Sequence, residues 1–225
     1  MRSAHGKLRT RQRMTAHMVS ILHLAIAVSA SLAILVDWRG HRPAFLALKP
    51  LTTLLVVALA AANTTGMENL VLLAALLLCL LGDIAIMQET QRGFLGGLLS
   101  FLLAHLILIA LFLHRADAMP LLALHYAVPL AVCAFAAIGA ALVPALRQID
   151  RPAALVYTAV LLTMSFAAFR FSTLAGFGAA MFVLSDAVLA YKTFRHDSRI
   201  AQAIVLTTYW LAITLIVDAF PVSVI

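Results

Sequence analysis

The chain has 225 residues, of which 64% are hydrophobic and only 11% are charged. Soluble domains carry about a quarter charged residues and at most about half apolar ones. The mean hydropathy of this chain, +1.05, is also that of a strongly apolar protein. The composition therefore excludes a soluble globular enzyme, a disordered chain and a nucleic-acid-binding module. The apolar runs are continuous and do not alternate with polar residues, so they predict membrane-spanning helices and not a membrane barrel.

The formal net charge of +7 is concentrated at the N-terminus. Five of the 16 basic residues, and none of the nine acidic ones, lie in the first 13 positions. Such a tail is typical of a topology signal or a solvated extension, and it could also attract anionic lipid headgroups. We therefore expect a basic N-terminal tail at residues 1–16 and a single transmembrane domain at residues 17–225.

Eight stretches are long and apolar enough to cross a bilayer, which takes about 20 residues. In chain order they are His17–Val36, Ala44–Ala62, Asn69–Gln88, Phe94–Leu113, Leu121–Val143, Pro152–Phe171, Leu174–Phe194 and Ile200–Val217. The sequence therefore predicts an all-α fold, a polytopic membrane bundle of eight transmembrane helices. Small residues four positions apart predict close helix contacts in lipid, as at Gly93 with Gly97 and at Ala175 with Ala179.

An even number of spans puts both termini on one side of the membrane. The basic tail favours a cytoplasmic N-terminus, but the loops on the opposite side carry about as many basic residues, so the charge rule does not assign the side. We expect an integral protein of a bacterial cytoplasmic (inner) membrane. Its expected surroundings are the lipid bilayer, with no nucleic-acid partner, and the sequence does not set an oligomeric state.

Six polar side chains inside the predicted spans share one half of the bilayer. Ionisable residues within a membrane are costly and usually face the interior of the bundle. With a rise of about 1.5 Å per residue, these six lie roughly 8 to 16 Å below the face opposite the termini. They come from six different helices: Lys49, Asp83, His105, Tyr157, Asp186 and Tyr209. Their shared depth predicts a single polar cavity in that half.

Asp83 and Asp186 are two carboxylates at comparable depth, which suggests acid/base chemistry. In a medium of low dielectric, one of two nearby carboxyl groups can stay protonated as a general acid while its partner stays ionised. The same pair would also suit a proton-coupled carrier, or two structural aspartates that each hydrogen-bond to a neighbouring helix.

Two further ionisable residues have more than one interpretation. Lys49, in LALKPLTTLLVV, could bind a phosphate, pair with Asp83 or extend to the membrane interface. His105 shares a helix face with Gly97 and Phe101, where a hydrogen-bonded core histidine is as common as a functional one. No ligand spacing for a metal is evident, and the two cysteines lie inside apolar runs, so we expect neither a metal nor a cofactor.

Five stretches with polar or small residues follow one another along the predicted helices. They are LKPLTT at Leu48–Thr53, LLGDIAIM at Leu80–Met87, GLLSFLLAHL at Gly97–Leu106, VYTAVLLTM at Val156–Met164 and GAAMFVLSDAVLAYKTF at Gly178–Phe194. As an ordered set they resemble the YhhN-like lysoplasmalogenase family of integral membrane proteins. The likeness runs from the second predicted helix to the eighth.

The resemblance implies an eight-helix hydrolase that cleaves the vinyl ether bond of lysoplasmalogens, which are phospholipids with one chain. The products would be a fatty aldehyde and glycerophosphocholine or glycerophosphoethanolamine. It further implies catalytic roles for Asp83 and Asp186, and substrate-binding roles for Lys49, His105, Tyr157, Ser185 and Tyr209. Two other classes stay open: a proton-coupled transporter of a small or lipid-like solute, and a non-enzymatic lipid-binding membrane protein.

Two positions depart from the pattern of the family. Ile213 stands where a glutamine usually follows the tyrosine of the last helix by four residues. Leu108 stands where a tyrosine often follows the histidine by three residues. Both changes remove a polar group that we expect near the cavity, and so they bear on headgroup preference more than on the fold.

Overall fold

The computed structural model describes residues 2–63, 66–115, 151–194 and 198–220, and nearly all of them are helical. The helices are α1 (Arg2–Trp38), α2 (Arg42–Asn63), α3 (Met67–Ile86), α4 (Gln91–Arg115), α6 (Arg151–Phe171), α7 (Thr173–Phe194) and α8 (Arg199–Asp218). Each is long and apolar enough to cross a membrane, with Met14–Trp38 as the candidate span of α1. The described residues contain no strand. The described part of the chain is therefore all-α, and its seven apolar helices are those of an integral membrane protein.

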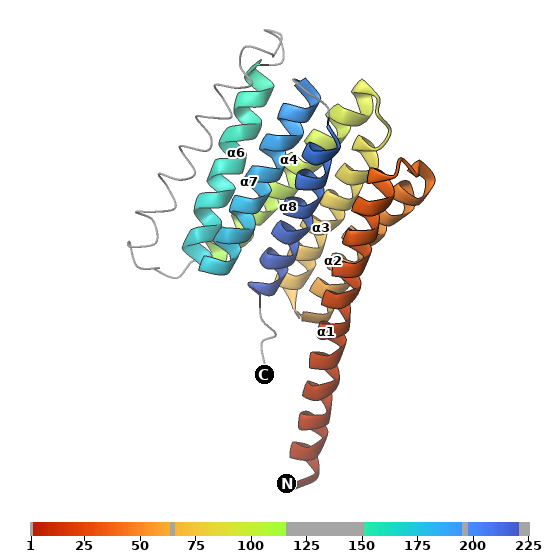
Figure 1. The fold of residues 1–225 in the computed structure, drawn as a ribbon. Coiled ribbons are helices and arrows are strands. Elements are labelled where there is room, and N and C mark those ends of the chain that lie inside the picture. The colour runs from red at the N-terminus through yellow and green to blue at the C-terminus, as the bar shows by residue number, and fades with distance from the viewer. Residues whose placement is uncertain (1, 64–65, 116–150, 195–197, 221–225) are drawn as a thin grey trace.

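Seven of the eight expected spans coincide with these seven helices. The remaining one, Leu121–Val143, lies outside the described residues, so the total of eight stays a prediction. The segment predicted as a basic tail is helical from Arg2 onward and forms the start of α1. Alanine, leucine, glutamine and the long basic residues favour a helix there, and no proline interrupts it. Figure 1 shows this part of α1 extending beyond the other helices.

The helices form one bundle whose two ends can be told apart by their ion pairs (Figure 1). At the far end, where α1 ends and α2 begins, Arg42 pairs with Glu89 of the α3–α4 turn, with 2.5 Å between Nη1 and Oε1. At the near end, Arg115 in the last turn of α4 pairs with Glu68 in the first turn of α3. α8 packs against α7, α2 and α1, and half of its candidate span is buried, the largest share among the described spans.

Close contacts between helices follow the small residues picked out in the sequence. A Cβ atom added to Gly93 of α4 would lie 2.5 Å from the carbonyl oxygen of Ala85 on α3. One added to Gly97 would lie 3.1 Å from the carbonyl oxygen of Gly82, and Ala175 and Ala179 of α7 are fully buried. Because lipid tails are as apolar as leucine, close packing and interhelical hydrogen bonds hold such a bundle together.

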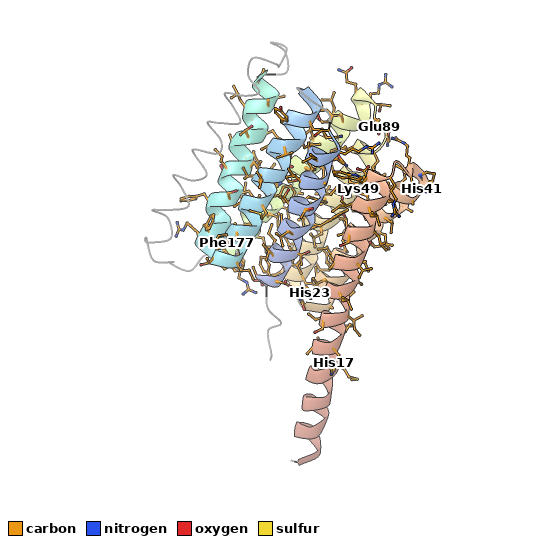
Figure 2. All side chains as sticks on the ribbon, in the orientation of Figure 1. His17, His23, His41, Lys49, Glu89 and Phe177 are labelled. Atoms are coloured by element: carbon orange, nitrogen blue, oxygen red, sulfur yellow. The ribbon has the colours of Figure 1, made fainter. Side chains whose placement is uncertain are left out.

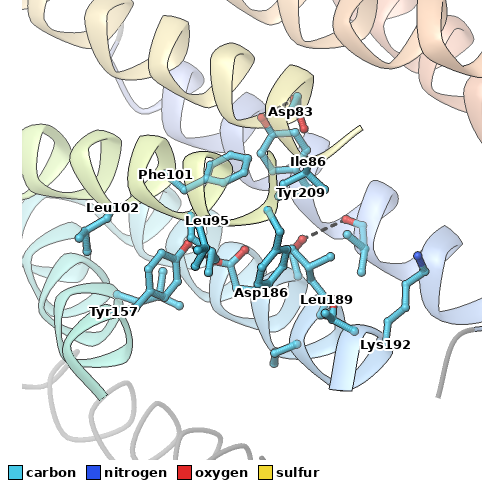
Figure 3. A pocket seen from close by; sticks show the side chains of 18 of the residues that line it. Asp83, Ile86, Leu95, Phe101, Leu102, Tyr157, Asp186, Leu189, Lys192 and Tyr209 are labelled. Carbon is cyan, nitrogen blue, oxygen red and sulfur yellow. Dashed lines mark hydrogen bonds between the residues drawn. The ribbon is translucent and has the colours of Figure 1, made fainter. Parts of the chain in front are cut away.

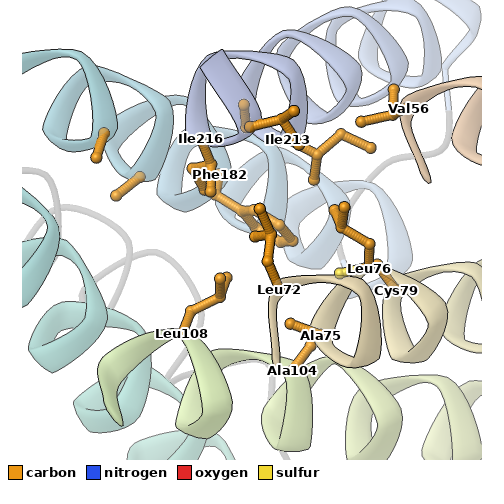
Figure 4. Close-up of a cluster of buried hydrophobic side chains, with 14 of the residues drawn as sticks. Val56, Leu72, Ala75, Leu76, Cys79, Ala104, Leu108, Phe182, Ile213 and Ile216 are labelled. Carbon is orange, nitrogen blue, oxygen red and sulfur yellow. The ribbon is translucent and has the colours of Figure 1, made fainter. Parts of the chain in front are cut away.

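The apolar core lies where α3, α4, α7 and α8 meet (Figure 4). It includes Leu72, Phe182, Leu108 and Ile213, all at most 2% exposed. Hydroxyl groups tie neighbouring helices together around it: Ser100 donates to the carbonyl oxygen of Leu78 at 2.7 Å, and Ser29 and Thr52 share a bond of 2.7 Å. These contacts fix the frame that carries the polar residues.

Replacing Gly93 with alanine should separate α3 from α4, because the new methyl group meets a backbone oxygen that cannot rotate away. We expect a loss of about 1 to 3 kcal/mol, typical of overpacking, measured as unfolding of the purified protein in detergent. Gly96→Ala is the matched control, since a Cβ there meets nothing within 4 Å. Equal stability of the two variants would contradict this account of the α3–α4 contact.

Candidate active site

A cavity of about 750 Å³ lies at the far end of the bundle, between α2, α3, α4, α6, α7 and α8 (Figure 3). Its size falls in the range of pockets that hold small molecules. Six of the seven site residues expected from the sequence line it: Lys49, Asp83, Tyr157, Ser185, Asp186 and Tyr209. Residues from five helices that are distant in sequence thus line one cavity.

Asp83 is almost completely buried, and its carboxylate has an ion-pair partner and hydrogen-bond donors within reach. Its Oδ1 lies 3.2 Å from the ammonium nitrogen of Lys49. Its Oδ2 accepts hydrogen bonds from Thr53 at 2.7 Å and from the hydroxyl of Tyr209 at 2.8 Å. Three donors on two other helices therefore surround this carboxylate, which satisfies both of its oxygens.

The periodicity of α2 explains why Lys49 and Thr53 reach the same carboxylate. They are four residues apart, so they lie on one face of the helix, and that face packs against α3. Thr53 is itself oriented from α8, because the indole nitrogen of Trp210 donates to its hydroxyl at 3.2 Å. Thr53 was not among the expected site residues, although its spacing of four from Lys49 could have indicated it, whereas nothing in the sequence indicated Trp210.

Asp186 has a simpler environment than Asp83. Its Oδ2 accepts a hydrogen bond of 2.6 Å from the hydroxyl of Tyr157, and within the described part of the chain Oδ1 has no hydrogen-bond partner. The residue is half-buried and lines the cavity (Figure 3). The adjacent Ser185 donates to the carbonyl oxygen of Val205 at 3.1 Å, which ties α7 to α8 beside the carboxyl group.

His105 is fully buried and lies outside the cavity lining. Neither ring nitrogen has a hydrogen-bond partner among the described residues. The ring packs edge-on against Phe182, with 4.6 Å between centroids, and against Tyr157 at 5.8 Å. The structure thus places His105 behind Tyr157, in contact with the residue that holds Asp186.

Ile213 and Leu108 also lie away from the cavity, in the apolar core (Figure 4). The departures from the family pattern therefore change the core and not the cavity wall. Several polar residues of the wall were not among the site residues expected from the sequence: Thr90, Gln91, Lys192, Thr193 and Gln202. They lie at the rim, where polar residues are ordinary in any membrane helix.

A second polar cluster lies at the near end, away from the cavity. His23 of α1 contacts Asp218 at 2.9 Å, and Asn63 lies 3.5 Å from the same carboxylate. His23, near this cluster, and Lys49, beside the cavity, are labelled at different heights of the bundle in Figure 2. Among the described residues, no group of three or more His, Cys, Asp or Glu side chains is placed to hold a metal ion.

The fold and the cavity define a class: an α-helical integral membrane protein with two carboxyl groups in one intramembrane cavity. The family model of the YhhN family matches residues 44–220 of the chain. The chain belongs to the YhhN family, which confirms the resemblance carried by the five sequence stretches. Comparisons with curated proteins and with solved structures find no match.

Replacing Lys49 with methionine should leave Asp83 buried without its cation. Removing one partner of a buried ion pair costs about 3 to 5 kcal/mol, which should appear as a lower unfolding temperature in detergent. Adding Asp83→Asn to this variant removes the unpaired charge and should restore most of the loss. Full stability of Lys49→Met alone would show that Lys49 does not compensate Asp83.

Proposed function

We propose that the protein is a lysoplasmalogenase-type ether hydrolase, which cleaves the vinyl ether bond of lysophospholipids with one alkenyl chain. The observation that supports this most directly is the pair of carboxyl groups, Asp83 and Asp186, on one cavity inside an otherwise apolar bundle. Membership of the YhhN family supports the same reading, as does a cavity large enough for part of a single-chain lipid.

The two carboxyl groups differ in a way that suits two different roles. Asp83 is held by an ammonium and two hydroxyl donors, which favours a fixed negative charge. Asp186 accepts one hydrogen bond, from Tyr157, and its other oxygen remains for the cavity. We therefore assign Asp186 as the general acid and Asp83 as the carboxylate that stabilises positive charge.

The reaction then balances with water as the only co-substrate. Asp186 donates its proton to the β-carbon of the vinyl ether, which leaves an oxocarbenium ion opposite the charge of Asp83. Water adds to the cationic carbon and returns a proton to Asp186. The hemiacetal collapses to a fatty aldehyde and a glycerophospho-alcohol. This division between an acid and a charge-stabilising carboxylate is analogous to glycoside hydrolysis.

A transporter and a lipid-binding protein would behave differently from a hydrolase when the same purified protein is assayed. Mass spectrometry of the purified protein incubated with mixed lysolipids should show loss of alkenyl ethers and release of aldehyde, with acyl esters intact. A proton-coupled transporter would instead move a solute across proteoliposomes without chemical change. A lipid-binding protein would retain bound lipid unaltered, and either result would refute the proposed hydrolysis.

Asp83→Asn and Asp186→Asn should each abolish aldehyde release, with a loss of at least about 100-fold, the lower range for removing a catalytic acid or a charge stabiliser. Asp218→Asn is the matched control: it neutralises a carboxylate at the near end, outside the cavity lining, and should keep turnover. Turnover near that of the wild type in either cavity variant would remove that aspartate from the mechanism.

Carbon protonation leaves an isotopic signature. Turnover in heavy water should place a single deuterium on the carbon next to the aldehyde carbonyl, because Asp186 exchanges its proton with solvent before it donates. Unlabelled aldehyde incubated with the Asp186→Asn protein in heavy water corrects for exchange of the product. Aldehyde formed without deuterium would exclude protonation at this carbon.

A further inference from the structure

We propose that the cavity has a side window between α4 and α6, through which the hydrocarbon chain of a bound single-chain lipid extends into the bilayer. The inference rests on the proposed function for the identity of the lipid. Its observations are separate, because they concern apolar residues of two helices and not the carboxyl groups. The side window is lined by Leu95, Leu98, Leu99 and Leu102 of α4 and by Thr158 and Leu162 of α6.

The helices around the cavity form a ring in which α2, α3, α4, α6, α7 and α8 each pack against two neighbours. On the side of α3 and α8, the lining residues are buried: Asp83, Val205, Leu206 and Tyr209 are at most 9% exposed. At the level of these residues, that side of the cavity is therefore closed toward the outer surface of the bundle.

The lining residues of α4 reach the outer surface. The four leucines are spaced by three and four positions, so they lie along one face of the helix. Leu95 is 54% exposed and Leu99 is 57% exposed, although both line the cavity. A side chain that borders a cavity and is also more than half exposed lies at an opening of that cavity. In a bilayer this part of the surface contacts lipid.

The exposed leucines lie on the side of α4 that points away from α3. A Cβ atom added to Gly93 or to Gly97 would lie 2.5 Å from an atom of α3, so these glycines mark the face that packs against α3. Leu95 and Leu99 follow them by two positions, which is about 200° around the helix. The next helix of the ring on the other side of α4 is α6. Figure 3 shows Leu95 on the same side of the pocket as Tyr157 of α6.

The side window is confined to the half of the bundle that carries the carboxyl groups. Toward the near end α4 and α6 are packed together, since Phe112 stacks on Phe171 with 5.7 Å between centroids. Leu99 lies eight positions after the start of α4, and Asp186 lies eight positions before the end of α7. Both of these helix ends are at the far end, so the two residues lie at a similar depth of about 12 Å.

The composition of the side window selects a hydrocarbon chain. Its α4 side consists of leucines, and the hydroxyl of Thr158 donates to the carbonyl oxygen of Ala154 at 2.6 Å, which satisfies it within α6. A charged group at this depth in the membrane is costly, so a phosphate would not pass. The polar residues of the lining, such as Gln91 and Gln202, lie at the far-end rim. A lipid with its ether at the carboxyl groups therefore keeps its headgroup at the rim and sends its chain sideways.

The test compares two substrates with the same headgroup: a long-chain alkenyl lysophospholipid, and a vinyl analogue whose alkenyl group ends at the reacting double bond. Leu99→Trp should fill the side window and lower kcat/KM for the long-chain lipid by about 10- to 100-fold, the range that corresponds to overpacking. The value for the vinyl analogue should change far less, because that substrate does not reach the side window. Leu106→Trp is the matched control, since Leu106 is 45% exposed on the same helix and lies outside the cavity lining.

Equal loss on both substrates, or loss on neither, would overturn the side window. A saturated alkyl-ether lysophospholipid, which this route cannot hydrolyse, gives a readout without turnover. Its Kd should rise by a similar factor in Leu99→Trp and stay unchanged in Leu106→Trp. That result together with no cleavage of any alkenyl ether by the wild type would refute the proposed function and retain the side window.

Photolabelling identifies what occupies the side window. A saturated alkyl-ether lysophospholipid with a diazirine in its chain should label peptides of α4 and α6, and excess unlabelled lipid should suppress this labelling. Suppressible labelling of α2, α3 or α8 instead would place the chain elsewhere and overturn the proposal. So would labelling confined to residues 116–150, or a wild-type dimer in detergent that Leu99→Trp dissociates, because the occupant would then be another part of the chain or a second copy.

Discussion

The burial of Asp83 is the constraint on which the rest of the structure depends. A carboxylate at 2% exposure inside a membrane span must have its charge matched locally, since neither water nor lipid can do so. Lys49 matches the charge, and Thr53 and Tyr209 complete the hydrogen bonds. These partners come from α2 and α8, so satisfying one side chain fixes how three helices lie against one another.

The two ends of the bundle differ in how completely their charged side chains are buried and paired. Toward the far end, Lys49 and Asp83 are buried and the partners of Asp83 lie within hydrogen-bond distance, although the Arg42–Glu89 pair at that end is exposed. At the near end the side chains of His23 and Asp218 are 37% and 28% exposed, so water can share in their solvation. Ion pairs that are exposed to this degree contribute little to stability, so we expect this pair to contribute less than the buried Lys49–Asp83 pair does to how the helices pack.

Much of this arrangement follows from the sequence, because a bilayer permits few solutions. Apolar runs of about 20 residues give the spans, and a charge within a span indicates a site, as Asp83 and Asp186 do. Rotation of each helix about its axis does not follow, since several apolar faces of a membrane helix look alike. For that reason His105, which was expected at the cavity, lies behind Tyr157, while Trp210 beside Thr53 and Lys192 in the cavity lining were not expected there. The helical start of α1 shows that a helix can continue beyond the apolar part that could cross a membrane, here Met14–Trp38.

Asp83 and Asp186 lie on walls of the cavity that hold them through different numbers of partners, which suits the two different roles proposed for them. The α2–α3–α8 wall holds Asp83 through several partners, so its charge and position are fixed before any ligand arrives. On the α6–α7 wall, Asp186 accepts a hydrogen bond from Tyr157 and is more accessible than Asp83, which suits the proton donor that we propose. A preorganised charge is most effective when it does not move during reaction, and a proton donor is most effective when it can be recharged. The proposed hydrolysis needs both, and two walls that differ in this way would supply a fixed charge and an exchangeable proton to the same ligand.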